Sequence, residues 1–314
     1  MRAFVIDSFA DEGSAREVPA PNPADGQVRI RVVAAGVNPV DAAVVAGYLK
    51  DMMEHRFPLI PGIDASGVID AIGAGVEGLA EGDEVFGGTG KMYFGEGSFA
   101  EHVTMSAGTI KRKPRSIGHR EAAAIPLAGV TAILLDEALG LSDGETVLAI
   151  GASGGVGTFL VQLAARRGAT VVAVCRGENA EYVHELGAAE VIDYSVEDVA
   201  VALRSRHPDG IDAIADMVGD REGLAQLTEQ LSRGGRVAST VGAADQEALA
   251  ARGMKAENVT TMVTTEHLTT LAEALDRGDL KGPQIQAFPL EGAGQALAQV
   301  GARHVRGKLV LTLG

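Results

Sequence analysis

The residues with the clearest chemical meaning form a glycine-rich run, Gly-Ala-Ser-Gly-Gly-Val-Gly, at positions 151–157. Small residues allow the backbone to approach a phosphate closely, and a helix that starts there presents free N–H groups and a partial positive charge. This chemistry suits a pyrophosphate. Gly154 and Gly157 match the second and third glycines of the G-x-G-x-x-G pattern, whereas its first position is Ala152, which departs from it.

The elements around this run are those that a dinucleotide site requires. Residues 146–150 are an apolar, partly β-branched run that predicts a buried strand, and residues 169–175 predict a second one. Between them, apolar residues at helical spacing predict a helix that ends at Gly168. The unit is therefore β-turn-α-β, over about thirty residues. The alternative is a tight β–α turn in a doubly wound domain that binds no nucleotide.

Alternating strands and helices continue after this unit. The sequence predicts a helix over 121–139, interrupted at Pro126 and Gly129, and a helix over 267–277. Further strands are expected at four places: 190–194, 211–217, 235–241 and 259–264. Strands separated by helices indicate an α/β fold with a doubly wound parallel sheet of the Rossmann type.

The first third of the chain has a different pattern, with short strands punctuated by glycine. They are expected at 28–34, 62–74, 82–87 and 97–104. Such closely spaced strands favour a partly closed barrel. Two more short strands, 284–289 and 308–312, follow the last predicted helix and resemble this β-rich part. We therefore expect a dinucleotide domain over 121–265, and one catalytic domain made of 1–120 and 266–314.

Composition excludes several classes of partner. The 314 residues carry a formal net charge of −15, which disfavours nucleic acid and anionic membranes because both are polyanions. Cys175 is the only cysteine, so no internal disulfide is possible and a reducing compartment is expected. The first residues lack the apolar core of a signal peptide, and no apolar run approaches the roughly twenty residues of a membrane span. The sequence predicts a soluble, cytoplasmic protein.

Seven segments, in this order, resemble the quinone oxidoreductases of the medium-chain dehydrogenase/reductase superfamily, in its zinc-free, zeta-crystallin-like branch. They are residues 35–41, 61–67, 97–102, 123–132, 151–157, 186–188 with 192–194, and 306–311. The resemblance covers almost the whole chain. It implies a GroES-like catalytic domain beside the Rossmann domain, a small-molecule substrate and a homodimer.

The same resemblance indicates whether the chain has ligands for a catalytic metal ion. Zinc-dependent relatives carry a cysteine ligand where this chain has Asn38, and a His-Glu pair where it has Ile63 and Asp64. Catalytic zinc needs three protein ligands, and the seven histidines show no ligand spacing. We therefore expect no metal. Without a Lewis acid, the favoured acceptors are quinones and alkenes conjugated to a carbonyl.

The choice of cofactor depends on the end of the second dinucleotide-domain strand. An acidic residue there binds the ribose in NAD-selective units, whereas this strand ends at Arg176, whose planar charged group suits a phosphate. By resemblance, Arg176 and Tyr194 contact the 2′-phosphate of NADPH. The alternatives are a solvated arginine and a packing tyrosine, and Glu178 could point at the same place.

The resemblance also gives the remaining site residues. The predicted cofactor-binding set is Asn38, Thr131, Ala152, Ser153, Gly154, Gly155, Val156, Gly157, Arg176, Tyr194, Val241 and Lys308. The predicted catalytic residues are Asn38, Tyr48 and Tyr93, since a tyrosine hydroxyl could stabilise a developing enolate or hydroquinone anion. Each has a structural alternative: a turn before Pro39 for Asn38, and packing for the tyrosines.

These features predict an NADPH-dependent, zinc-independent reductase of quinones or α,β-unsaturated carbonyl compounds. Two alternatives stay open. One is an enoyl-thioester reductase, for which the basic residues of 111–115 would form an entrance for a charged carrier. The other is a non-enzymatic, crystallin-like protein that binds NADPH.

Overall fold

The structure, a computed structural model, describes residues 1–313, which fall into two compact units. The β-rich unit consists of Met1–Val130 and the described residues from Met262 onward, and the parallel-sheet unit consists of Thr131–Thr261. The first division between them falls inside the helix Pro126–Leu139 (α3). Within the β-rich unit, the Leu127 N–H at the start of this helix donates to the carboxylate of Asp64, at 3.2 Å.

A six-stranded parallel sheet forms the centre of the parallel-sheet unit. Its order is β12-β11-β10-β13-β14-β15, so the chain winds outward in both directions from β10. The strands are Thr146–Ile150 (β10), Thr170–Cys175 (β11), Glu190–Asp193 (β12), Ile211–Asp216 (β13), Leu231–Ser239 (β14) and Lys255–Asn258 (β15). The order reverses between β10 and β13, and ligands bind at such a switch point in open α/β sheets.

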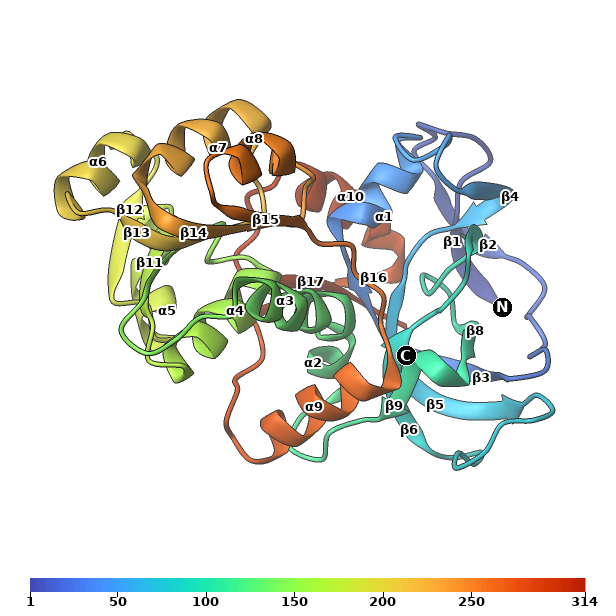
Figure 1. Ribbon diagram of the computed structural model, residues 1–314. Coiled ribbons are helices and arrows are strands. Elements are labelled where there is room, and N and C mark those ends of the chain that lie inside the picture. The colour runs from blue at the N-terminus through green and yellow to red at the C-terminus, as the bar shows by residue number, and fades with distance from the viewer. Residues whose placement is uncertain (314) are drawn as a thin grey trace. The chain divides into compact units, whose positions relative to one another are not determined.

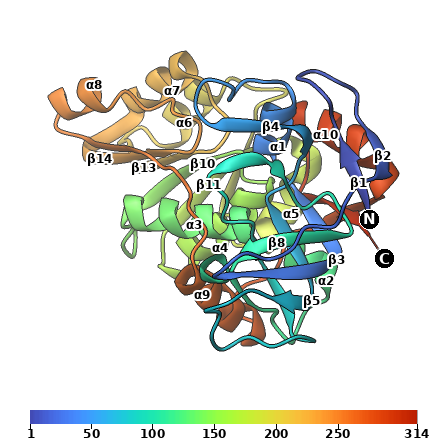
Figure 2. The same ribbon diagram turned by 90° about the vertical axis from the view of Figure 1, so that its right-hand side faces the viewer.

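Helices cover both faces of this sheet (Figures 1 and 2). The helices α3, Gly155–Arg166 (α4) and Ala180–Glu185 (α5) lie on one face. The other face carries Val199–Arg206 (α6), Arg221–Leu227 (α7) and Gln246–Ala251 (α8). Apolar side chains of β10, β11, β13 and β14 pack there against Leu203, Leu224 and Leu249 in one core.

Two sequence predictions in this region need correction. The sixth strand is β15, and 259–264 contains no strand; β15 reads Lys-Ala-Glu-Asn, and an edge strand with so little apolar character leaves no periodic signal. The helix predicted over 121–139 is two helices, His119–Ala123 (α2) and α3. The break falls before Pro126, which lacks an N–H and therefore starts a helix more readily than it continues one.

The β-rich unit is built on a seven-stranded sheet. Its order is β16-β17-β3-β5-β6-β9, and β8 also pairs with β3. The strands are Gln27–Val37 (β3), Asp64–Ile72 (β5), Glu84–Gly88 (β6), His102–Ser106 (β8), Ile110–Arg112 (β9), Ile285–Pro289 (β16) and Lys308–Thr312 (β17). Because β17 pairs antiparallel with β3, the two ends of the chain share one sheet.

Smaller elements complete this unit. Two strand pairs lie outside the main sheet: Arg2–Val5 (β1) with Ser14–Glu17 (β2), and Glu54–Ile60 (β4) with Tyr93–Glu96 (β7). Its other helices are Pro39–Val45 (α1), Thr265–Asp276 (α9) and Ala293–Gly301 (α10). The core joins apolar residues of β3, β5 and β17 to those of α10, including Leu297 and Val300.

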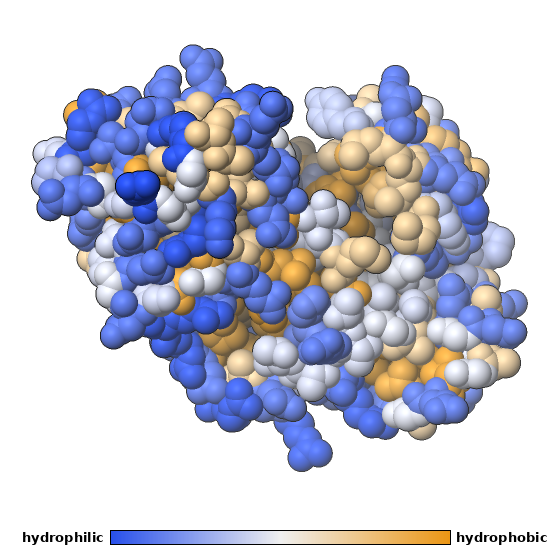
Figure 3. All heavy atoms as spheres, viewed as in Figure 1, coloured by the Kyte–Doolittle hydropathy of each residue, from blue (hydrophilic) through white to orange (hydrophobic). Residues whose placement is uncertain are grey.

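Part of the surface of the β-rich unit is apolar. Figure 3 shows weakly hydrophobic surface, in tan, over the part that carries α1 and β4. Exposed apolar side chains of the loop between these elements include Tyr48 and Met52, and Phe57 follows within β4. Within residues 1–313, no helix is both long and apolar enough to cross a membrane.

Candidate active site

The glycine-rich turn of the parallel-sheet unit begins where β10 ends. Gly151 has a φ of +88°, a conformation that side chains of L-residues rarely adopt. The turn therefore needs a glycine one position before the start of the G-x-G-x-x-G pattern. Ala152, which departs from that pattern, is fully buried with an ordinary φ, so its methyl group is tolerated.

The protein's own packing requires a glycine at position 157 of this turn but not at position 154. A Cβ at Gly157 would overlap the carbonyl oxygen of Ala152, so the start of α4 can pack on the turn only without a side chain. At Gly154 the φ is −80°, and a Cβ would meet nothing closer than the Gly151 oxygen at 3.4 Å. The protein's own packing therefore does not require glycine at 154. An open position at an uncapped helix start fits the close approach of a phosphate group.

Contacts that the sequence did not reveal hold this turn in place. The Thr158 hydroxyl donates to the Gly154 carbonyl at 2.9 Å and lies 2.7 Å from the Tyr182 hydroxyl of α5. The side-chain amide of Asn179, just before α5, donates to the Ser153 hydroxyl at 3.3 Å. The turn is thus tied to the segment that follows β11. Neither Tyr182 nor Asn179 belongs to a sequence motif from which this role could be predicted.

The structure brings Arg176 and Tyr194 to one edge of the sheet. Cys175 of β11 is paired with Asp193 of β12, so the next residue of each strand emerges beside the other. Tyr194 is 44% exposed, and Arg176 is partly exposed. Hydrogen bonds from Ser195 lower the pKa of Asp193, and the Arg176 charge acts in the same direction. Arg176 therefore has a carboxylate as a neighbour.

A buried pair of polar side chains shapes the loops after β13 and β14. The hydroxyl of Ser239 donates to the carboxylate of Asp216 at 2.7 Å, and both residues are fully buried. Asp216 accepts the Gly219 N–H at 2.7 Å, and Ser239 accepts the Val241 N–H at 3.3 Å. Val241, a predicted cofactor contact, is thereby held at the carboxyl edge with 41% of its surface exposed. The only sequence signal for this pair is a polar residue at the end of each strand.

Thr131, another predicted cofactor contact, belongs to the same unit. It is buried in α3, and its hydroxyl lies 2.7 Å from that of Thr261. The hydroxyl pair joins the first and last residues of the parallel-sheet unit.

In the β-rich unit, Asn38 stands at the centre of a buried polar network. It precedes α1 and is 2% exposed. Its side-chain nitrogen donates to Asp64 Oδ2 at 3.0 Å, and its backbone N–H donates to Asp41 Oδ2 at 2.8 Å. Lys308 donates from Nζ to Asn38 Oδ1 and, at 3.0 Å, to the Val37 carbonyl. The structure thus joins Asn38 and Lys308, which lie 270 positions apart in the chain.

Burial dominates the electrostatics of this network. It raises the pKa of Asp41 to about 7 and that of Asp64 to about 6, against the opposing influence of Lys308. Burial lowers the pKa of the Lys308 ammonium, while the two carboxylates act to raise it. Burying a charge is unfavourable unless it is paired and hydrogen-bonded, so each of these groups depends on the others.

The two predicted catalytic tyrosines lie in different surroundings. Tyr48 is 81% exposed. Tyr93 donates its hydroxyl to Glu96 at 2.7 Å, and the Arg56 guanidinium lies 3.6 Å from the centre of its ring. Burial, together with the Glu96 carboxylate, raises the pKa of Tyr93 to about 12. Tyr93 therefore has to leave Glu96 before it can donate to another group.

The residues at the position of the zinc relatives' ligands do not suit zinc. Asn38 and Ile63 supply neither a thiolate nor an imidazole, and the carboxylate of Asp64 is occupied by the Asn38 and Leu127 N–H groups. Among residues 1–313, no three His, Cys, Asp or Glu side chains form a group that could hold a metal ion.

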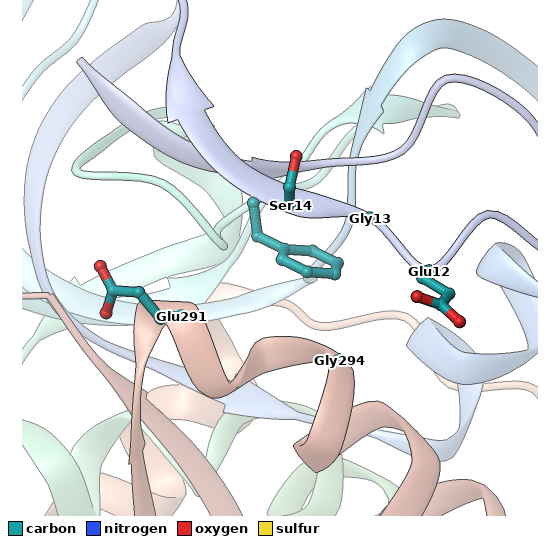
Figure 4. A pocket seen from close by; sticks show the side chains of 6 residues that line it. Glu12, Gly13, Ser14, Glu291 and Gly294 are labelled. Carbon is teal, nitrogen blue, oxygen red and sulfur yellow. The ribbon is translucent and has the colours of Figure 1, made fainter.

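A cavity of about 370 Å³ lies elsewhere in the β-rich unit. It is lined by Phe4, Glu12, Gly13, Ser14, Glu291 and Gly294, and Figure 4 shows the carboxylates of Glu12 and Glu291 at opposite ends of it. Glu291 is paired with Arg2. None of the predicted site residues lines this cavity.

Comparison with known proteins gives the family. Residues 24–115 match the alcohol dehydrogenase GroES-like domain, and residues 186–311 match the family described as zinc-binding dehydrogenase. A chloroplastic quinone oxidoreductase of Triphysaria versicolor is 30% identical over 326 residues, which cover 99% of this chain and 98% of that protein. A chloroplastic NADPH-dependent alkenal/one oxidoreductase of Arabidopsis thaliana is 32% identical over 298 residues, covering 91% and 72%.

A solved structure agrees with these relatives. The quinone oxidoreductase of Coxiella burnetii superposes with a TM-score of 0.90 at 28% identity, covering 100% of this chain and 99% of that one. The chain belongs to the medium-chain dehydrogenase/reductase superfamily, in its quinone oxidoreductase branch, and it is an enzyme of that type. The resemblance and the fold class predicted from the sequence are confirmed.

The raised pKa of Asp41 predicts a pH dependence of stability. Between about pH 4 and 7 the native state keeps a proton on Asp41 that the unfolded chain has released, because the pKa is about 7 in the fold against an ordinary value of 3.8. The free energy of unfolding should therefore fall as the pH rises through this window, by up to about 4 kcal/mol. Urea unfolding of the wild type and of Asp41→Asn, from pH 4 to 8, checks this.

The comparison of the two proteins isolates Asp41 from other groups. His119, for example, has a pKa lowered by burial, so its contribution to stability rises with pH and opposes that of Asp41. Relative to the wild type, Asp41→Asn should gain stability as the pH rises. Parallel stability curves for the two proteins would show that Asp41 is an ordinary carboxylate.

Proposed function

We propose that this enzyme is an NADPH-dependent reductase that transfers hydride, without a catalytic metal, to quinones or α,β-unsaturated carbonyl compounds. The observation that carries the proposal is the buried network of Asn38, Asp41, Asp64 and Lys308. It stands where zinc relatives hold their metal, in a chain whose dinucleotide turn is intact. The relatives named as a quinone oxidoreductase and as an NADPH-dependent alkenal/one oxidoreductase support the same conclusion.

The parallel-sheet unit supplies the proposed cofactor contacts. The open position at Gly154 and the uncapped start of α4 suit the pyrophosphate. Arg176 and Tyr194, side by side at the carboxyl edge, suit a 2′-phosphate. Asp193 lies close to Arg176 and is the feature that would weaken a preference for NADPH. Ala152, Ser153, Gly155, Val156, Gly157, Thr131 and Val241 complete the proposed set in this unit.

When bound, the reduced nicotinamide supplies the hydride, and the protein positions it and excludes water. In the β-rich unit, the proposed acceptor side combines the exposed Tyr48 with Met52 and Phe57. We propose Tyr48 as the hydrogen-bond donor to the acceptor's oxygen. Tyr93 can serve in the same way only after its hydroxyl leaves Glu96.

The absence of ligands suited to zinc decides which acceptors fit. An unconjugated ketone that accepts hydride builds up alkoxide charge on a single oxygen. A quinone or an enone spreads the charge over its own conjugated atoms, so one hydrogen bond can provide the stabilisation that it needs. This reasoning favours conjugated acceptors over simple ketones.

The basic segment at 111–115 gives little support to a charged carrier substrate. Arg112 pairs with Asp83 at 2.7 Å, and Lys113 donates to two backbone carbonyls, at 3.0 and 2.7 Å. Two of the four basic side chains of this segment therefore have partners within the protein. We keep the enoyl-thioester reductase as the second enzymatic possibility, and the non-enzymatic NADPH-binding protein as the third.

We also propose that the protein is a cytoplasmic homodimer. Within the described sheet of the parallel-sheet unit, β15 is an edge strand that pairs only with β14. A free edge can accept a strand of a second copy. The single cysteine, buried in β11, fits a reducing compartment.

A panel of acceptors tests the proposed reaction. NADPH oxidation by the purified enzyme should be fast with para- and ortho-quinones and with short enones, and slow with saturated ketones and enoyl thioesters. Activity should survive exhaustive chelation, because no metal takes part. Preference for enoyl thioesters would select the second possibility, and no NADPH oxidation with any acceptor would select the third. Loss of activity together with stoichiometric zinc would overturn the mechanism.

Arg176→Ala tests the cofactor preference. A charge-assisted hydrogen bond is worth roughly 1.5–3 kcal/mol, so the Kd for NADPH should rise about ten- to a hundredfold. The Kd for NADH should change little because NADH lacks the 2′-phosphate. Arg204→Ala, an exposed arginine of α6, is the matched control and should leave both constants unchanged. Equal losses for both cofactors in Arg176→Ala would mean that Arg176 supports the fold instead.

A further inference from the structure

Lys308 is a lysine at a buried position, which is unusual for a charged side chain. It lies at the start of β17 and is only 5% exposed. Its ammonium donates to the Val37 carbonyl at 3.0 Å and to Oδ1 of Asn38. Lysine is rarely so buried without a reason. The contacts of its ammonium are with the protein itself, in the segment where β3 leads into α1.

The network determines which way the Asn38 carboxamide points. An ammonium only donates hydrogen bonds and an ionised carboxylate only accepts them. The atom that faces Lys308 must therefore be Oδ1, and the atom that faces Asp64 must be Nδ2, in agreement with the 3.0 Å contact. A rotation of the amide by 180° would place two donors against each other and two acceptors against each other. Lys308 and Asp64 together exclude this rotation.

We propose that Lys308 is a positioning residue, which acts by holding the Asn38 carboxamide in one orientation rather than by contacting the cofactor itself. Oδ1 keeps its second lone pair, so Asn38 is presented as an acceptor for one hydroxyl donor of a bound ligand. The nicotinamide-side ribose offers such hydroxyl groups. This last step rests on the proposed function, whereas the orientation of the amide does not.

The charges of the cluster explain why the lysine is needed. With all groups ionised, one ammonium faces the two carboxylates of Asp41 and Asp64, which lie on α1 and β5. Without the ammonium, two buried carboxylates would remain uncompensated, and they would take up protons. A protonated carboxyl group can donate as well as accept. The orientation of Asn38 would then no longer be determined.

The direct test uses the ligand-free protein. The side-chain amide resonances of Asn38, identified by their loss in Asn38→Asp, report on its two N–H groups. Lys308→Met should shift these resonances, and Lys308→Arg, which keeps the charge, should leave them close to the wild-type position. Lys308→Gln, which is neutral but polar, should shift these resonances in the same way. It replaces Lys308→Met in the test if that variant does not fold. Unchanged resonances in the neutral variants would overturn the proposal.

A matched control separates this effect from the general loss of a buried lysine. Lys113, in the same unit, has a largely buried side chain as Lys308 does, but it donates to two backbone carbonyls and not to Asn38. Lys113→Met should lower stability without moving the Asn38 resonances or the Kd for NADPH. If it moves them as Lys308→Met does, the Lys308 effect is non-specific and the proposal fails.

A double-mutant cycle then tests whether Lys308 acts through Asn38. Lys308→Met should raise the Kd for NADPH roughly three- to tenfold, the range of one lost neutral hydrogen bond. In the Asn38→Ala background the same change should add less than about twofold, because the group that Lys308 positions is gone. Equal effects in both backgrounds would mean that Lys308 contacts the cofactor directly, and no effect in either would also refute the proposal.

The experiments distinguish a wrong role for Lys308 from a wrong proposed function. The resonances and the Kd for NADPH do not depend on which acceptor is reduced. An enzyme that binds NADPH and reduces none of the acceptors would refute the function, while the cycle would still decide the role of Lys308.

Discussion

The burial of one ammonium and two carboxylates around a single carboxamide is the interaction on which the β-rich unit depends. Lys308 comes from β17, Asp64 from β5, Asn38 and Asp41 from the start of α1, and the Leu127 N–H from the start of α3. Removing one partner from such a group leaves an uncompensated buried charge, which is strongly destabilising. Each of these elements must therefore keep its position relative to the others.

In the parallel-sheet unit, buried polar side chains at the strand ends hold the loops that follow them. Its strands end in loops whose backbone N–H groups need acceptors, and Asp216 and Ser239 provide them from the buried ends of β13 and β14. The turn after β10 is shaped differently, by the Thr158 hydroxyl, which donates to the Gly154 carbonyl, and by the positive φ of Gly151. The result is a row of ordered loops at the carboxyl edge, with open backbone positions at Gly154 and the start of α4. An edge organised in this way can receive a ligand without rearranging.

Local rules made much of this predictable from the sequence. The strand–turn–helix unit follows from short-range patterns, and β10 begins and ends at the predicted residues. The predictions failed where the signal is weak or distant. The edge strand β15 is too polar to show periodicity. The sequence marked the interruption at Pro126, but α3 continues through Gly129, where a second interruption was expected. The contact of Lys308 with Asn38 and that of Tyr93 with Glu96 depend on side-chain geometry, which spacing in the chain does not encode. The glycine that the turn requires is Gly151, one position before the start of the pattern. Alanine is therefore tolerated at position 152, where the pattern has a glycine.

The central claim is that hydride passes directly from the nicotinamide to the β-carbon of a conjugated acceptor. NADPH carrying deuterium at C4, prepared separately as the two stereoisomers, tests it most directly with a short enone. The account predicts that one stereoisomer alone delivers deuterium, that the label appears only at the β-carbon, and that the hydrogen at the α-carbon comes from solvent. A reduced product without deuterium from either stereoisomer, or with the label at the α-carbon, would contradict it.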